Sequence, residues 1–344
     1  MVESLIMIPQ ARAALSEPKP PVSVIESLTT GFETVASHLG LILFPIALDV
    51  FLWLGPHLSI NPIVQKSVDL VKSIRFYDPA SIERQKMLAE ELLPVMGERT
   101  NVFTMLSTAP LGVPSLMAGQ LPLALPGGQP VILPLNNELL FLTLALTFAL
   151  LGLLLGAIYF NMVGSLLRDG DASPALPQTI RRIITNWANL TAFCLIVGVV
   201  IVFVSLPAII FITLLQLVSP LLGELGLSMW GALVLWVFAY LAFSLHGMVL
   251  KGRGVFGSMW DSIRLVQWNL WAVMGLFILI FLLNWGLGYV WSLPKPDSWL
   301  TLAGIAGHAF VSTGLVAATF VFYKDRYRWW AEMRQWLLAS AKRK

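Results

Sequence analysis

The stretch Leu190–Thr213, LTAFCLIVGVVIVFVSLPAIIFIT, contains no charged side chain. A helix of this length is about 36 Å long, which exceeds the roughly 30 Å hydrocarbon core of a bilayer. Backbone groups in lipid must find hydrogen-bond partners within the protein, and the stretch lacks the alternating pattern of a barrel strand. It therefore predicts a transmembrane helix.

The composition of the whole chain agrees with this interpretation. Of 344 residues, 57% are hydrophobic and 12% are charged, whereas a typical soluble protein has about 25% charged residues. This excludes a water-soluble globular protein. The single cysteine, Cys194, excludes an intramolecular disulfide, and the net charge of +3 gives no support for binding nucleic acid.

Other stretches along the chain have the same apolar character, and together they predict an all-α, polytopic transmembrane helical bundle. Residues 1–23 are expected to form a flexible tail, residues 24–323 a membrane domain, and residues 324–344 a basic, Trp-rich cytoplasmic tail. The six expected spans are 39–55, 139–163, 190–213, 227–250, 270–291 and 300–323.

Lysine and arginine residues set the expected orientation. If the N-terminus lies inside, fifteen of the 22 basic residues fall on the cytoplasmic side. Cytoplasmic connections carry such an excess, and long outer loops count little. We therefore expect a multi-pass protein of the cell (inner) membrane with both termini in the cytoplasm.

Residues 56–137 form the one long extramembrane segment in this arrangement. Its first half is amphipathic around Pro62–Arg75 and after Ser81, which predicts helices. Its second half, Ala109–Pro134, is rich in proline and nearly uncharged, which favours an extended or turn-rich chain folded over the bundle. Neither half accommodates a catalytic domain.

Three short amphipathic segments lead directly into inside-to-outside spans. The spans begin just after His38, Asn189 and Asn269, where a polar residue can cap the first helical turn. Each lead-in could lie in the headgroup plane, which would give three repeats of an interfacial helix and a hairpin. The alternative is that any amphipathic lead into a span has this pattern.

The third lead-in, Gly257–Leu270 (GSMWDSIRLVQWNL), carries a family resemblance. Over Val24–Lys324 the chain resembles uncharacterised bacterial six-span membrane protein families related to the membrane domain of glycerophosphoryl diester phosphodiesterases. The resemblance implies an all-helical membrane fold. In the phosphodiesterases this domain is paired with a soluble catalytic barrel, which we do not find here, so we expect no such activity.

Asp49 is the one acid inside an apolar run, LILFPIALDVFLW at 41–53. An ionisable group at this depth is expected to face the protein and to have a partner. Helix geometry places Asp49, Asn284 and His308 each about 9 to 12 Å below the outer end of its span. The cluster would serve either as a proton, cation or substrate contact, or as an interhelical hydrogen-bond network that fixes packing.

Basic and aromatic residues gather at the expected cytoplasmic rim and predict contacts with anionic lipid headgroups. Ordinary positive-inside topology is the alternative explanation. The residues are Arg181, Arg182, Lys251, Arg253, Lys324, Arg326 and Arg328.

Gly152 and Gly156 form a small-residue face that predicts close packing against another helix, within the chain or in a dimer. Signatures of metalloproteases, hydrolases, phosphate-binding loops and dinucleotide sites are missing from the sequence. The four histidines are spread over different depths, so we expect no metal and no cofactor.

These observations favour a non-enzymatic membrane component that organises the envelope or regulates a partner complex. The alternative is a transporter of a lipid-like or small amphiphilic substrate that uses the polar layer around Asp49.

Overall fold

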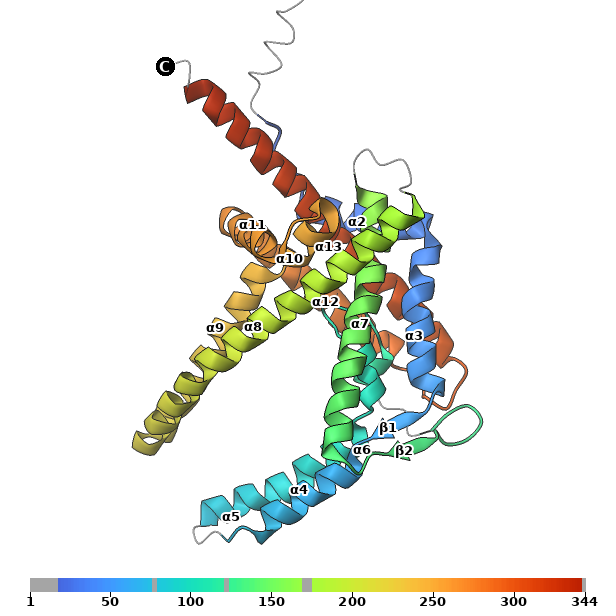
Figure 1. Cartoon of the computed structure of the whole chain (residues 1–344), viewed down its shortest axis with the longest axis vertical. Helices are drawn as coiled ribbons and strands as arrows, with labels where there is room; N and C mark the ends of the chain where they lie inside the picture. Colours follow the sequence, from blue (N-terminus) through green and yellow to red (C-terminus); the bar gives the residue numbers. More distant parts are fainter. Residues whose placement is uncertain (1–17, 76–78, 121–123, 169–174, 342–344) are drawn as a thin grey trace, which may run out of the picture. The chain divides into compact units, whose positions relative to one another are not determined.

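The computed structural model describes residues 18–75, 79–120, 124–168 and 175–341. About 80% of the chain is helical, which confirms the all-α fold class (Figure 1). The chain divides into two compact units. The first unit holds the described residues of Met1–Thr34, Leu206–Leu279 and Gly314–Lys344, and the second holds Val35–Ser205 and Ile280–Thr313.

Five helical segments are long and apolar enough to cross a membrane, counted over the described part of the chain. Each overlaps one of the expected spans, from the second to the sixth. They are α7 (Glu138–Leu167), α8 (Leu176–Val218), α9 with α10 (Pro220–Leu241 and Ser244–Lys251), α12 (Leu270–Trp291) and α13 (Thr301–Ala341).

The first expected span is short and comes directly after a sharp bend. Helix α2 (Val24–Ser37) meets the 3-10 turn η1 (Leu39–Ile42) and α3 (Leu43–Leu54) at an angle of 90° around His38. The pair is long and apolar enough to cross only when both parts are counted together. Pro45 lies in the first turn of α3, where a missing backbone N–H is tolerated.

The three lead-in segments differ from one another in the structure. Helix α2 is separate from η1 and α3, and α11 (Val255–Trp268) ends before Asn269 and α12. By contrast, α8 runs through Asn189 without interruption from Leu176.

The segment between α3 and α7 is tied together at its two ends. Strand β1 (His57–Ser59) pairs in parallel with β2 (Ile132–Pro134), and Figure 1 shows them side by side. Between the strands lie short helices whose apolar faces meet at Val64, Val68 and Ala89. These are α4 (Asn61–Ser73), α5 (Pro79–Lys86), the π-helical turn η2 (Met87–Leu92), α6 (Leu93–Arg99), and the 3-10 turns η3 (Val102–Leu106) and η4 (Met117–Gly119).

The small-residue face of α7 packs against this segment, which we name the outer segment after its expected position. A Cβ atom added to Gly152 would lie 2.5 Å from the carbonyl oxygen of Met105, and one added to Gly156 would lie 2.6 Å from that of Leu111. Gly152 therefore packs within the chain against the 3-10 turn η3, and Gly156 packs against the irregular backbone that follows η3. The backbone of this segment fills the space because its carbonyl groups approach where a side chain would block them.

Candidate functional site

Asp49 lies in α3 with no solvent exposure. Its carboxylate accepts hydrogen bonds from the hydroxyl of Ser115 and from the backbone N–H groups of Leu116 and Met117, the last two at 3.0 Å. The Ser115 hydroxyl in turn accepts a hydrogen bond from the N–H of Ala118 at 2.9 Å. Asp49 therefore binds the start of η4 and holds the outer segment against α3.

Of the two partners expected for Asp49, one is close to it. The Nδ1 atom of His308 in α13 lies 4.0 Å from the Asp49 carboxylate and has no hydrogen bond within the described structure. Asn284 in α12 is exposed, and no hydrogen bond connects it with Asp49 in the described ranges. The placement of Asn284 in the polar cluster is therefore wrong, because its side chain is exposed and does not reach the buried carboxylate.

The principal donors to Asp49 were missed because they belong to an irregular segment far along the chain. One physical argument could have indicated where these donors lie. Helical N–H groups are used within their own helix, so a buried carboxylate finds free donors most readily in non-helical backbone. This preference favours the outer segment as the source of donors but does not single out Ser115.

A second cluster lies in the first unit, at the C-terminal end of α10. The ammonium group of Lys251 lies over the ring of Tyr327 and 5.6 Å from the ring centre of Tyr323. Arg253 donates a hydrogen bond to the hydroxyl of Tyr327 at 3.0 Å, and its Nε lies 3.2 Å from the Asp261 carboxylate. Two of the predicted rim residues are thus joined by aromatic rings and one acid.

Asp261 is a site residue that the sequence reasoning missed. It lies in α11 and is 7% exposed. Burial raises the pKa of its carboxyl group above the ordinary value, while the positive charges of Arg253, Lys251 and Arg264 lower it. The signal in the sequence is its position in WDSIR, within the third lead-in segment.

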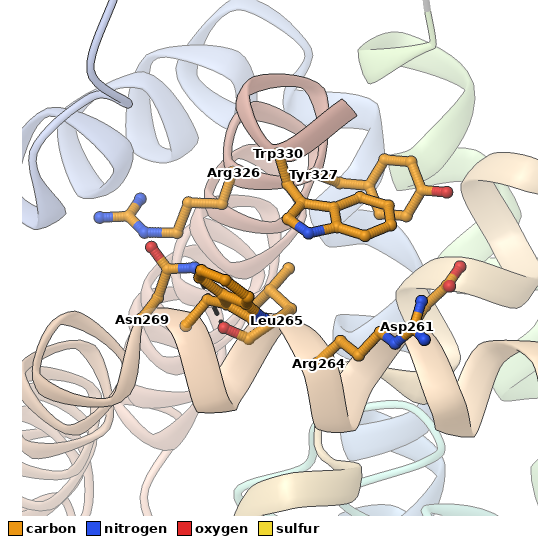
Figure 2. Close-up of a pocket in the computed structure, with 8 residues that line it drawn as sticks. Asp261, Arg264, Leu265, Asn269, Arg326, Tyr327 and Trp330 are labelled. Carbon is orange, nitrogen blue, oxygen red and sulfur yellow. Dashed lines mark hydrogen bonds between the residues drawn. The ribbon is translucent and has the colours of Figure 1, made fainter. Parts of the chain in front are cut away.

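A small pocket opens beside this cluster, between α11 and the C-terminal part of α13 (Figure 2). Arg326 reaches it from α13 and is 4% exposed. Its guanidinium group lies 3.7 Å from the ring centre of Phe322. The pocket is lined by Asp261, Arg264, Leu265, Trp268, Asn269, Arg326, Tyr327 and Trp330.

The remaining rim residues lie elsewhere. Arg181 and Arg182 belong to the first turns of α8, in the second unit. Arg328 is exposed and pairs with Glu332 one turn along α13 at 3.2 Å. Lys324 is half-buried on the same helix.

No group of three or more His, Cys, Asp or Glu side chains that could hold a metal ion occurs among the residues the structure describes.

No protein-family model, no curated protein and no solved structure matches this chain. The resemblance to the membrane domain of glycerophosphoryl diester phosphodiesterases therefore stays a prediction. The function of the protein is inferred from its own geometry.

Proposed function

We propose that this chain is a non-enzymatic component of a bacterial inner membrane that organises the envelope or regulates a partner complex. The observation that carries the proposal is the burial and hydrogen bonding of Asp49. Both carboxylate oxygens accept hydrogen bonds, from Ser115, Leu116 and Met117, and the side chain has no solvent exposure. Its hydrogen bonds hold the outer segment in place.

This geometry favours the structural use of Asp49 over the transport alternative. A proton or substrate contact needs a group that the ligand can reach and whose lone pairs become available. Here three donors from one short segment enclose the carboxylate, so releasing it would require the outer segment to detach. Transport of a lipid-like substrate remains the second candidate because His308 Nδ1 lies 4.0 Å away without a hydrogen bond in the described structure.

For the topology we propose six spans with both termini in the cytoplasm, arranged as three hairpin repeats. The helix breaks at His38 and Asn269 support the first and third units, and the excess of basic residues on one side supports the orientation. The resemblance to the phosphodiesterase membrane domain is in keeping with this arrangement.

We also propose that the part of the cytoplasmic rim around Lys251, Arg253 and Arg326 binds anionic lipid. Arg328 is not part of this site, because it is exposed and pairs with Glu332. Lys251, Arg253 and Arg326 lie in one unit with exposed tryptophans such as Trp268, which is 69% exposed. Tryptophan is enriched at the membrane–water interface, and basic side chains there attract anionic headgroups.

The variant Asp49→Asn tests the role of Asp49. Replacing one acceptor oxygen by an NH₂ group opposite N–H donors should lower the free energy of unfolding by about 1–3 kcal/mol, measured by thermal melting in detergent. Movement of a fluorescent phospholipid across proteoliposomes should match protein-free vesicles for both the variant and the wild type. Asp297→Asn, at an exposed acid in the same unit, is the matched control and should melt like the wild type.

The opposite pattern would support the transporter. In that case the wild type would move the phospholipid faster than empty vesicles do. Asp49→Asn would then abolish this movement without changing the melting temperature.

A further inference from the structure

We propose that the pocket between α11 and the C-terminal part of α13 binds one phosphate oxygen of an anionic phospholipid headgroup, with Arg326 as the principal donor. This inference rests on the proposed lipid-binding role of the rim and assigns that role to a defined site.

Arg326 is a buried cation whose hydrogen-bonding groups are not all used. Its Nε and Nη1 atoms have no hydrogen-bond partner within the described part of the chain. The ring of Phe322 covers the guanidinium group but offers no acceptor oxygen. The neighbouring acid, Asp325, already accepts a hydrogen bond from the N–H of Val22 at 2.7 Å. Buried N–H groups of a charged side chain are costly without an acceptor, so Arg326 requires an acceptor oxygen.

The charge of the pocket selects an anion over a cation. Arg264 and Arg326 contribute two positive charges, and Asp261 is the acid that lines the pocket. Asp261 is already paired with Arg253, whose Nε lies 3.2 Å from it. The Nδ2 group of Asn269 donates to the carbonyl of Leu265 at 3.0 Å, as the dashed line in Figure 2 marks. The residues that line the pocket therefore carry more positive than negative charge.

The size of the pocket limits what can enter. Its volume is about 10 Å³, which is room for about one water-sized group. One oxygen of a phosphodiester fits this space, whereas a whole nucleotide or sugar phosphate does not. The rest of the headgroup would remain outside the pocket, beside the lining residues Trp268 and Trp330.

The position of Arg326 along α13 agrees with headgroup depth. It lies 25 residues after Thr301, the first residue of this unbroken helix, which is about 38 Å along the axis. The hydrocarbon core is about 30 Å thick, and the headgroup layers extend to about 40–45 Å in total. If α13 crosses the bilayer from its first turn, Arg326 lies among the headgroups.

The experiment uses the full chain, purified in a neutral detergent and freed of lipid. Binding of short-chain phosphatidylglycerol, short-chain phosphatidylcholine and inorganic phosphate is measured by thermal shift. We expect Arg326→Gln to bind phosphatidylglycerol about tenfold more weakly than the wild type, because a charge-assisted hydrogen bond is lost. Arg328→Gln, at an exposed arginine two residues further on, is the matched control and should stay within about twofold.

Three outcomes of this experiment would each contradict a different part of the proposal. Equal weakening in Arg326→Gln and Arg328→Gln would overturn the pocket while leaving a diffuse affinity for anionic lipid intact. A wild type that binds phosphatidylglycerol no better than phosphatidylcholine would overturn the proposed lipid-binding role of the rim. Inorganic phosphate binding as tightly as phosphatidylglycerol would show that the ligand is free phosphate and not a lipid.

A second variant tests the pocket if Arg326→Gln does not fold, as judged by gel filtration. Arg264 is half-buried beside Trp260 and lines the same pocket. We expect Arg264→Gln to weaken binding of phosphatidylglycerol severalfold more than Arg328→Gln does. Equal binding by these two variants would overturn the proposal.

Discussion

Asp49 and Arg326 are both buried ionisable residues, and they differ in how their hydrogen bonds are satisfied. Asp49 has three donors around it, whereas two nitrogens of Arg326 lack acceptors in the described structure. The burial of Asp49 could be predicted from the sequence, because a charge inside an apolar run must face protein. The identity of its partners could not, because Ser115 lies 66 residues away in a segment without a periodic pattern.

His57 makes the stability of the outer segment depend on pH. Burial lowers the pKa of its imidazole below the ordinary value of 6.5, and a backbone hydrogen bond with Leu52 raises it in part. Below pH 6.5 the unfolded chain therefore takes up a proton that the folded chain does not, so stability decreases as the pH falls. We expect the stability of the wild type to decrease between pH 7 and pH 5 through this group.

The variant His57→Gln removes the titrating group. Chemical unfolding at pH 7 and at pH 5 should show a smaller decrease in stability for the variant than for the wild type. Parallel decreases in the two proteins would contradict the prediction.

Among the elements, α7 shows how close packing depends on a missing side chain. Gly156→Ala would place a methyl group 2.6 Å from the carbonyl oxygen of Leu111, so the outer segment must shift. We expect the free energy of unfolding to fall by about 1–3 kcal/mol, measured by thermal melting in detergent.

Gly198→Ala in α8 is the matched control, since an added Cβ there meets nothing within 4 Å. This change should stabilise the protein by about 0.5–1 kcal/mol, because alanine favours the helix over glycine. A destabilisation of the same size in both variants would show that Gly156 is not a point of close approach.

Helix boundaries depended on contacts that the sequence does not display. Asn189 and Asn269 occupy the same local pattern, yet the chain breaks only at Asn269. The first part of α8 is held along α7 by side chains one turn earlier. Trp187 donates to the carbonyl of Leu150 at 3.0 Å, and Asn186 donates to Asn161 at 3.1 Å. With its first turns fixed in this way, α8 continues directly into the apolar stretch.

For the molecule as a whole, the apolar segments could be predicted. The hydropathy of a segment depends on its own residues, so no knowledge of tertiary contacts is needed. Five of the expected spans coincide with long apolar helices of the described chain. The first span is different: at residues 39–55 it is too short alone, and the bend at His38 leaves its crossing dependent on α2. The candidate site was only partly predictable, because Asp261 and the donors to Asp49 act through distant contacts.

Cysteine labelling tests the topology. In a Cys194→Ala background, Ser73→Cys and Ala339→Cys introduce thiols at two exposed positions. A membrane-impermeant maleimide should label Ser73→Cys in intact spheroplasts, and it should label Ala339→Cys only after lysis.

The variant Glu26→Cys then distinguishes six spans from five. With six spans this exposed position in α2 is protected in intact spheroplasts, like Ala339→Cys. If α2 and α3 do not cross together, Glu26→Cys reacts from outside, like Ser73→Cys, and the proposed cytoplasmic N-terminus is wrong.

The pairing of β1 with β2 also determines how the second unit bears load. A lateral force that separates α3 from α7 pulls on the start of β1 and on the end of β2. In a parallel pair these forces act along the strands in opposite directions, so the pair is loaded in shear. The N–H of His57 donates to the carbonyl of Val131 at 2.8 Å, and the N–H of Leu135 donates to that of Ser59 at 2.9 Å. Under shear these hydrogen bonds bear the force at the same time, so they do not break one after another. The segment between the two strands is thereby a mechanical clamp between α3 and α7.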